Sequence, residues 1–229
     1  MTKKSSLWRK EYETAGIPSS TREEPSGAVV SFVEFLRANK ILEGVALDLG
    51  CGKGRNSIFL SQQGFEVYSI DFVCEAINHL RTEAEKLGLQ NRIHTYCQSV
   101  AERWPNVAES VDVAIDAFCY KHQVDRGERD AYKSELIRVL KPNAMYLLTL
   151  AGDDDGYYGP LLLTSPNPRE KVIVDPNNGI PSNLYTKQEI LGDFGKDFEL
   201  EGYEHKIKPG LMHGRQYLRS THVFHFRKR

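Results

Sequence analysis

The chain lacks several features that would assign it to a specialised class of protein. It has only four cysteines in 229 residues, with no C-x-x-C pair and no spacing typical of metal ligands. No apolar run approaches the length of a membrane span, and the basic N-terminal residues are not followed by an apolar stretch. We therefore predict a cytoplasmic protein with reduced thiols, no membrane partner and no bound metal.

The sequence also lacks an excess of either charge. Its 30 Lys and Arg residues nearly balance 31 Asp and Glu residues, which gives a formal net charge of -1. No global positive field is available to attract nucleic acid, so we expect a small-molecule partner instead. A chain of this length builds one well-buried core. We expect residues 1–229 to form a single domain that acts as a monomer or homodimer.

Apolar runs and helical periodicities alternate along the chain, which predicts a parallel sheet with crossover helices. The expected strands are 45–49, 66–70, 92–97, 111–116 and 144–150, followed by 198–207 and 215–227. The expected helices are 28–36, 55–63, 74–87, 129–140 and one that begins near residue 187. Residues 1–40 would form an N-terminal helical cap. The Gly- and Pro-rich residues 151–183 would form an insertion without regular structure that acts as a lid.

A glycine-rich turn follows the first expected strand. Gly50, Gly52 and Gly54 allow the backbone to turn sharply and to approach a ligand closely. Asp48 precedes them, and a carboxylate at this point would repel a pyrophosphate but attract an ammonium or sulfonium group. Asp71 ends the next strand about twenty residues after the glycines, where an acid can accept hydrogen bonds from both ribose hydroxyls.

At these residues the chain resembles the class I S-adenosylmethionine-dependent methyltransferases. Their first motif has the pattern acid-x-Gly-x-Gly-x-Gly, which residues 48–54 match, and their second strand ends in an acid. The resemblance covers residues 45 to about 150. Within the family, the chain is most similar to the small-molecule branch, which includes tellurite-resistance and thiopurine-type enzymes. It implies a Rossmann-like, doubly wound α/β fold with a seven-stranded, mostly parallel sheet and an antiparallel last strand.

The resemblance also implies S-adenosyl-L-methionine as the cofactor and S-adenosyl-L-homocysteine as the product. The methionine end would be held by Asp48 and by the backbone amides of the glycine turn, namely those of Gly50, Cys51 and Gly52. Asp71 would hold the ribose.

Three residues would hold the adenine. Phe72 would pack against its face, Ser99 stands where the family favours an aspartate, and Val100 offers its backbone amide. The alternatives are that Phe72 is a core aromatic and that Ser99 is a helix cap.

The end of the fourth strand should face the methyl acceptor. Relatives that methylate planar amide or adenine nitrogens carry [Asp/Asn/Ser]-Pro-Pro-aromatic there, whereas this chain has Asp-Ala-Phe-Cys, which disfavours those substrates. Asp116 and His122 are the candidate catalytic residues, with His122 as proton acceptor. Tyr120 would contact the acceptor. A capping or packing role is the alternative for His122, and a buried core thiol is the alternative for Cys119.

Residues outside the strand ends would complete the acceptor pocket. The aromatic candidates, at the N-terminus and in the insertion, are Trp8, Tyr12, Tyr157 and Tyr158. Arg215 in the last hairpin suits an acceptor that carries a carboxylate. The three adjacent aspartates at 153–155 predict a solvated acidic turn, because no further metal ligands can be identified beside them. The alternative is that they coordinate a divalent cation, as in catechol-type methyltransferases.

We therefore predict methyl transfer from S-adenosylmethionine to an O, S or N atom of a small molecule. The alternatives are a tRNA or protein methyltransferase and a catalytically inactive S-adenosylmethionine-binding protein. The basic residues after position 205 predict a solvated sheet face rather than an RNA-binding surface. An NAD-dependent dehydrogenase is disfavoured because Asp48 would repel the pyrophosphate.

Overall fold

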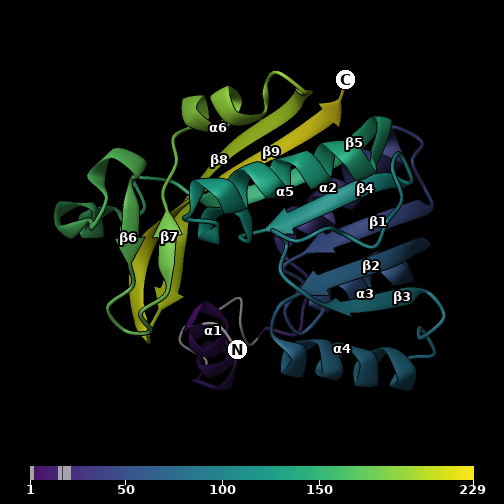
Figure 1. Cartoon of the computed structure of the whole chain (residues 1–229), viewed down its shortest axis with the longest axis horizontal. Coiled ribbons are helices and arrows are strands. Elements are labelled where there is room, and N and C mark those ends of the chain that lie inside the picture. The colour runs from purple at the N-terminus through teal and green to yellow at the C-terminus, as the bar shows by residue number, and fades with distance from the viewer. Residues whose placement is uncertain (1–2, 15–16, 18–21) are drawn as a thin grey trace.

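The centre of the fold is a seven-stranded sheet in the order β3-β2-β1-β4-β5-β9-β8, seen in a computed structural model that describes residues 3–14, 17 and 22–229 (Figure 1). The strands are β1 Gly44–Leu49, β2 Phe65–Asp71, β3 Ile93–Cys97, β4 Val111–Ala117, β5 Leu140–Ala151, β8 Phe198–Met212 and β9 Arg215–Lys228. The first five pair in parallel, and β9 is antiparallel to both β5 and β8. The predicted fold class is confirmed.

Helices cover both faces of the sheet. Their bounds are α1 Lys3–Thr14, α2 Gly27–Ala38, α3 Arg55–Gln62, α4 Cys74–Lys86, α5 Arg126–Val139 and α6 Lys187–Phe194. Side chains of α2, α3 and α4 form one buried cluster with the sheet, and side chains of α5 and α6 form a second cluster on the other face. The α1 helix lies beside the carboxyl ends of the parallel strands (Figure 1). None of the helices in the described part of the chain is long and apolar enough to cross a lipid bilayer.

Element boundaries differ from the predicted ones where local capping decides them. The α5 helix begins earlier than expected because the Asp125 side chain accepts a hydrogen bond from the Glu128 amide. The β8 and β9 strands run further than expected and turn at His213 and Gly214, whose φ angles are 46° and 75°. Two consecutive residues with positive φ form the tight turn that suits the twist of a hairpin.

The insertion contains short regular elements, which corrects the prediction of an irregular segment. It holds the 3-10 helices η3 Gly159–Thr164 and η4 Pro168–Glu170 and the antiparallel pair β6 Val172–Val174 and β7 Pro181–Asn183. The acidic turn at its start is not simply solvated. Asp155 is 1% exposed and accepts bonds from the amides of Tyr157, Tyr158 and Ser220.

A disulfide joins Cys74 at the start of α4 to Cys97 at the end of β3. The prediction of reduced thiols is therefore wrong for this pair, while Cys51 and Cys119 are free. No sequence pattern predicts the bond, because the two cysteines are 23 residues apart and only the crossover brings their Cα atoms to a distance of 5.2 Å.

Replacing both Cys74 and Cys97 by serine should lower the free energy of unfolding by about 3 kcal/mol, because the bond closes a loop in the unfolded chain. Urea unfolding of the wild type with and without a thiol reductant measures this loss. The serine variant is the control, since the reductant should leave its unfolding midpoint unchanged. If the reductant leaves the unfolding midpoint of the wild type unchanged, the disulfide contributes nothing to the free energy of unfolding.

Candidate active site

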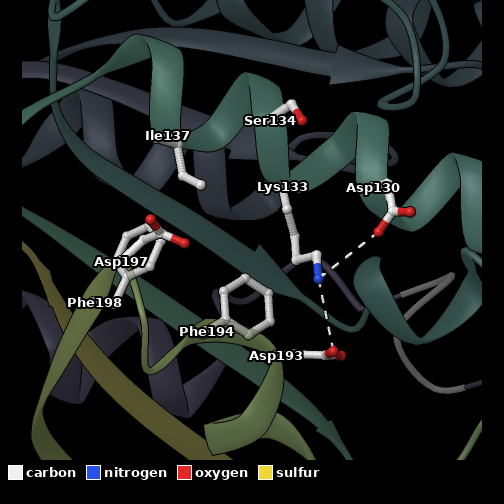
Figure 2. Close-up of a pocket in the computed structure, with 8 residues that line it drawn as sticks. All are labelled: Asp130, Lys133, Ser134, Ile137, Asp193, Phe194, Asp197 and Phe198. Carbon is white, nitrogen blue, oxygen red and sulfur yellow. Dashed lines mark ion pairs between the residues drawn. The ribbon is translucent and has the colours of Figure 1, made fainter.

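A cavity of about 660 Å³ lies at the carboxyl edge of the parallel strands. Its walls come from the glycine turn after β1, the ends of β2 and β4, the α1 helix and the β8–β9 hairpin. Parallel α/β sheets bind ligands at this edge. A smaller pocket of about 250 Å³ lies between α5 and the segment from α6 to β8, where Lys133 reaches toward Asp130 and Asp193 (Figure 2). It contains no part of the glycine turn, so the larger cavity is the candidate site.

The turn after β1 requires backbone conformations that glycine adopts at low cost and other residues avoid. The φ angles of Gly50, Gly52 and Gly54 are 68°, 55° and 87°. A Cβ on Gly50 would lie 2.6 Å from the Cys119 Sγ, so only glycine fits between the two strand ends.

The amides that we expected to hold a ligand are engaged within the protein. Those of Gly50 and Cys51 donate to the Ile70 carbonyl at 2.9 and 3.0 Å, and that of Gly52 donates to Asp71 at 2.9 Å. All three residues line the cavity nevertheless. The turn therefore lets a ligand approach the backbone closely, but it does not offer that ligand free amides at these three residues.

Asp48 lies beneath the turn, 1% exposed and outside the cavity lining. Its Oδ2 accepts a bond from the Ser57 hydroxyl at 2.6 Å, while Oδ1 has no hydrogen-bond partner among the described residues. Burial raises the pKa of Asp48 to about 7. A positively charged ligand group above the turn would favour the ionised carboxylate.

Asp71 stands at the mouth of the cavity at the end of β2. Its Oδ1 accepts from the Val73 amide at 2.8 Å, and its Oδ2 accepts from the Gly52 amide and from the Tyr12 hydroxyl at 3.3 Å. Burial raises its pKa and these three bonds oppose the rise. Phe72 follows it and lines the same cavity, as an adenine-facing residue should.

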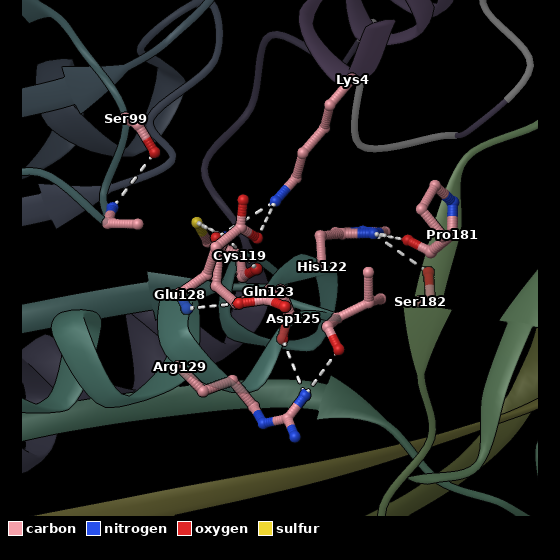
Figure 3. A network of polar contacts seen from close by, with 12 residues as sticks. Lys4, Ser99, Cys119, His122, Gln123, Asp125, Glu128, Arg129, Pro181 and Ser182 are labelled. Carbon is pink, nitrogen blue, oxygen red and sulfur yellow. Dashed lines mark hydrogen bonds and ion pairs between the residues drawn. The ribbon is translucent and has the colours of Figure 1, made fainter. Parts of the chain in front are cut away.

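The two other residues expected at the adenine lie outside the cavity lining. The Ser99 hydroxyl accepts a bond from the Ala101 amide at 3.1 Å in a turn (Figure 3). No helix of the described chain begins there, so Ser99 does not have the alternative role of a helix cap either. Val100 is buried, and its carbonyl accepts from the Trp104 indole at 2.9 Å.

Asp116 is fully buried and shapes the turn after β4. Its two oxygens accept from the amides of Cys119 and Tyr120 at 2.7 and 2.8 Å and from the Tyr132 hydroxyl at 2.8 Å. Burial raises its pKa to about 7. Both Asp116 and Tyr120 lie outside the cavity lining, and the Tyr120 hydroxyl donates to Asp193 at 2.9 Å from within the core. The structure thus places these two candidates beneath the site rather than in it.

His122 lines the cavity and connects three segments. Its Nδ1 lies 2.9 Å from the Pro181 carbonyl and 3.0 Å from the Ser182 hydroxyl, both on β7 (Figure 3). Trp8 of α1 meets the ring edge-on at 4.8 Å between centroids. Burial lowers the pKa of His122 well below its usual value, so the ring is neutral at physiological pH.

Lys121, the residue before His122, is a cavity residue that the sequence did not single out. It is 2% exposed, and its Nζ lies 4.0 Å above the centre of the Tyr158 ring. Burial lowers its pKa to about 7, and the Arg219 guanidinium adds to the effect. Nothing in its local sequence distinguishes it from a surface lysine.

The α1 helix covers one side of the cavity, with Trp8 and Tyr12 in the lining. Lys4 holds its first turn to the start of α5, through Glu128 at 2.7 Å and Gln123 at 3.2 Å (Figure 3). The Lys53 ammonium donates to the Tyr12 carbonyl at 2.9 Å. These contacts bring the predicted N-terminal aromatics to the strand ends.

The remaining acceptor-side candidates divide. Tyr158 lines the cavity, but Tyr157 lies outside it and donates to Asp175 at 2.8 Å. Arg215 is exposed at the end of the hairpin, and the arginine that lines the cavity is Arg219, which donates to Asp155 at 2.8 Å. Strand alternation places residues 215 and 219 on one face, so the sequence periodicity could have identified Arg219 as a candidate beside Arg215.

Positive charge dominates the lining. Among its described residues only Asp71 carries a carboxylate, whereas seven carry a cationic group: Arg22, Lys53, Arg55, Lys121, Lys206, Lys208 and Arg219. A cavity with this balance attracts negatively charged ligands even though the chain as a whole is nearly neutral.

Comparison with known proteins agrees with this geometry. Residues 46–143 match the family described as a methyltransferase domain. The probable S-adenosyl-L-methionine-dependent methyltransferase TehB of Haemophilus influenzae is 30% identical over 118 residues, which is 52% of this chain. The matched stretch spans only 35% of that relative's length.

Solved structures share the fold. A methyltransferase described as S-adenosylmethionine-dependent, from Methanosarcina mazei, superposes with a TM-score of 0.70 at 24% identity, over 82% of this chain and 93% of that one. The 1,6-didemethyltoxoflavin-N1-methyltransferase of Burkholderia thailandensis, with bound 1,6-didemethyltoxoflavin and S-adenosylhomocysteine, gives a TM-score of 0.72 at 18% identity. That superposition covers 98% of this chain and 86% of the other.

Proposed function

We propose that this chain, in which residues 46–143 match a methyltransferase domain, is a class I S-adenosylmethionine-dependent methyltransferase. It transfers a methyl group from S-adenosylmethionine to an O, S or N atom of a small, negatively charged molecule, with S-adenosylhomocysteine as the second product. The observation that carries this proposal is one cavity in which the glycine turn and Asp71 face a cluster of cationic side chains. A volume of about 660 Å³ suits two small molecules in contact.

The residues at the β1 and β2 ends fit the cofactor. Asp71 would accept the ribose hydroxyls where it now accepts the Tyr12 hydroxyl, and Phe72 would cover the adenine. Asp48 lies buried beneath the glycine turn and outside the cavity lining, so its carboxylate would attract a cationic methionine end through the turn and not by direct contact. The cofactor supplies a methyl group activated by a sulfonium, so the protein has to align the two substrates and remove a proton from the acceptor.

Lys121 is the better placed of two candidate proton acceptors. A general base works best when its pKa is near the working pH, and burial brings that of Lys121 to about 7. The pKa of His122 is lowered much further, and its Nδ1 already contacts β7. We assign His122 to positioning, since it connects Trp8 of α1 to β7, and we assign Asp116 to holding the turn that carries both residues.

The cationic side chains on the hairpin would select the acceptor. Lys206, Lys208 and Arg219 face the cavity from β8 and β9. Arg219 suits a carboxylate or phosphate, although its Nε is held by Asp155 and only the rest of its guanidinium is available. The α1 helix and the insertion 151–183 would act as a cap over the same domain.

A catalytically inactive S-adenosylmethionine-binding protein is the second candidate. Buried Lys121 argues against this candidate. Binding the cofactor alone does not require a lysine with a pKa of about 7 in the part of the cavity proposed for the acceptor. A tRNA or protein substrate would need a basic surface that extends beyond this cavity.

We predict that carboxylate-bearing or phosphate-bearing acceptors will be methylated with kcat/KM at least about 10-fold higher than their uncharged ester or amide counterparts, on the scale of one charge-assisted hydrogen bond. Release of S-adenosylhomocysteine from paired acceptors measures this ratio. A preference for the uncharged partner in every pair would contradict the anionic class. Calorimetric binding of S-adenosylmethionine without turnover of any acceptor would favour the inactive protein, and binding of NAD alone would overturn the family function.

A further inference from the structure

Three potential metal ligands from distant parts of the sequence meet on the sheet face opposite the cavity. They are Asp154 in the turn after β5, His205 on β8 and His222 on β9, and one ligand atom of each lies within 4.8 Å of the others. The two histidines are direct partners in the β8–β9 ladder, with rings stacked at 4.6 Å. The His205 Nε2 lies 3.4 Å from the Asp154 Oδ2.

The His222 ring shows that this cluster is more than a surface ion pair. His222 is 5% exposed, and its Nε2 has no hydrogen-bond partner within the described part of the chain. A buried imidazole nitrogen without a partner lacks the hydrogen bond that native structures almost always provide.

The His222 Nε2 lies beside the space above Gly152. A Cβ built on Gly152 would lie 2.9 Å from the His222 Nε2 and 2.7 Å from the Ser220 hydroxyl, and it would also contact the Asp154 Oδ1. Three polar atoms, one from the turn after β5 and two from β9, therefore converge at a glycine that has no side chain to fill the space.

Neighbouring groups orient the ligands as in metal sites. The Tyr203 hydroxyl lies 2.8 Å from the His222 Nδ1, and a proton on that nitrogen leaves the lone pair on Nε2. The Ser220 hydroxyl donates to Asp154 at 2.5 Å and lies 2.7 Å from the His205 Nε2, so it holds these two ligands together.

We propose that Asp154, His205 and His222 bind a divalent transition-metal ion of the zinc type, at a site independent of methyl transfer. Two imidazoles and one carboxylate form a donor set that suits Zn²⁺ or Co²⁺ and not Mg²⁺ or Ca²⁺, which prefer oxygen ligands. The Asp154 and His205 side chains are 49% and 32% exposed, so water can complete the coordination.

The site has a structural role. Thr221 and Val223 flank His222 on β9 and line the cavity from the other face of the strand. A metal ion would fasten the start of the insertion to the hairpin that carries Arg219 and Lys206. This proposal differs from our prediction of no bound metal, which considered residues 153–155 without the two strands that the fold places beside them.

Titration of the chelator-treated full chain with ZnCl₂ in a calorimeter tests the site. We expect one equivalent to bind with a Kd of roughly 1 µM or tighter, and we expect Co²⁺ to give visible ligand-field bands. The half-exposed variants Asp154→Asn and His205→Gln should fold and should each weaken binding at least about 10-fold, the scale for loss of one ligand contact. His222→Gln should behave alike, and His79→Gln on the exposed face of α4 is the control. No stoichiometric binding, or binding that all three ligand variants retain, would overturn the proposal.

Discussion

Replacing Asp71 by alanine should weaken S-adenosylmethionine binding by roughly 100-fold or more. A hydrogen bond to a charged group contributes about 1.5–3 kcal/mol, and Asp71 is placed to accept two from the ribose. The same carboxylate also holds the Gly52 and Val73 amides, so its loss would loosen the glycine turn as well. Calorimetric titration with S-adenosylmethionine and S-adenosylhomocysteine measures the change.

Glu66→Ala is the matched control for Asp71→Ala. Glu66 lies on the same strand, but its side chain is exposed and pairs with His94 at the edge of the sheet. Its removal should leave the affinity unchanged. An Asp71→Ala variant that binds the cofactor as tightly as the wild type would remove Asp71 from the cofactor site, whatever the family motif suggests.

Replacing Lys121 by methionine should lower kcat by about 100-fold or more while cofactor affinity stays within a few-fold, since positioned general bases contribute about 10²–10⁴-fold. The wild-type rate should rise as pH increases through about 7, because the neutral amine, which accepts the proton, then replaces the ammonium. In the methionine variant this rise should disappear. Rates measured from pH 6 to 9 with saturating substrates separate the two profiles.

The neighbouring His122→Ala variant distinguishes a base from a positioning residue. Since the pKa of His122 lies well below its usual value, its removal should reduce the rate without moving the pH profile. If His122→Ala abolishes the rise near pH 7 and Lys121→Met keeps it, the roles are reversed. Lys121→Met should keep the stability of the fold, because methionine fills a similar volume and, below about pH 7, avoids the cost of a buried ammonium.

Lys121, which is proposed to raise the rate of methyl transfer, lowers the stability of the folded chain. Its folded pKa lies below the value of 10.5 for a free lysine, so the unfolded chain binds more protons between about pH 7 and 10.5. Lys121 therefore costs stability most fully below pH 7, and the cost fades as pH rises. A residue kept in this state fits a site that needs a neutral amine.

The sequence alone determined the fold and the place of the glycine turn, Asp71 and Phe72 at one cavity, while Asp48, Ser99 and Val100 lie outside its lining. Local apolar periods defined the strands and helices, and the glycines with Asp48 and Asp71 lie within one strand-turn-helix-strand unit. Contacts within such a unit depend on backbone geometry that a short segment dictates by itself. This is why the glycine turn and Asp71 are found at the cavity where they were predicted.

Only the tertiary structure decided the rest of the cavity lining and the cluster of Asp154, His205 and His222. Lys121, Asp116 and Tyr120 are all buried, but only Lys121 lines the cavity, and no local pattern encodes that difference. The β8–β9 register selects Arg219 over Arg215 and brings His205 to His222. Side chains from segments distant in sequence acquire their charge state and partners only when the sheet closes, because desolvation and distance are properties of the packed chain.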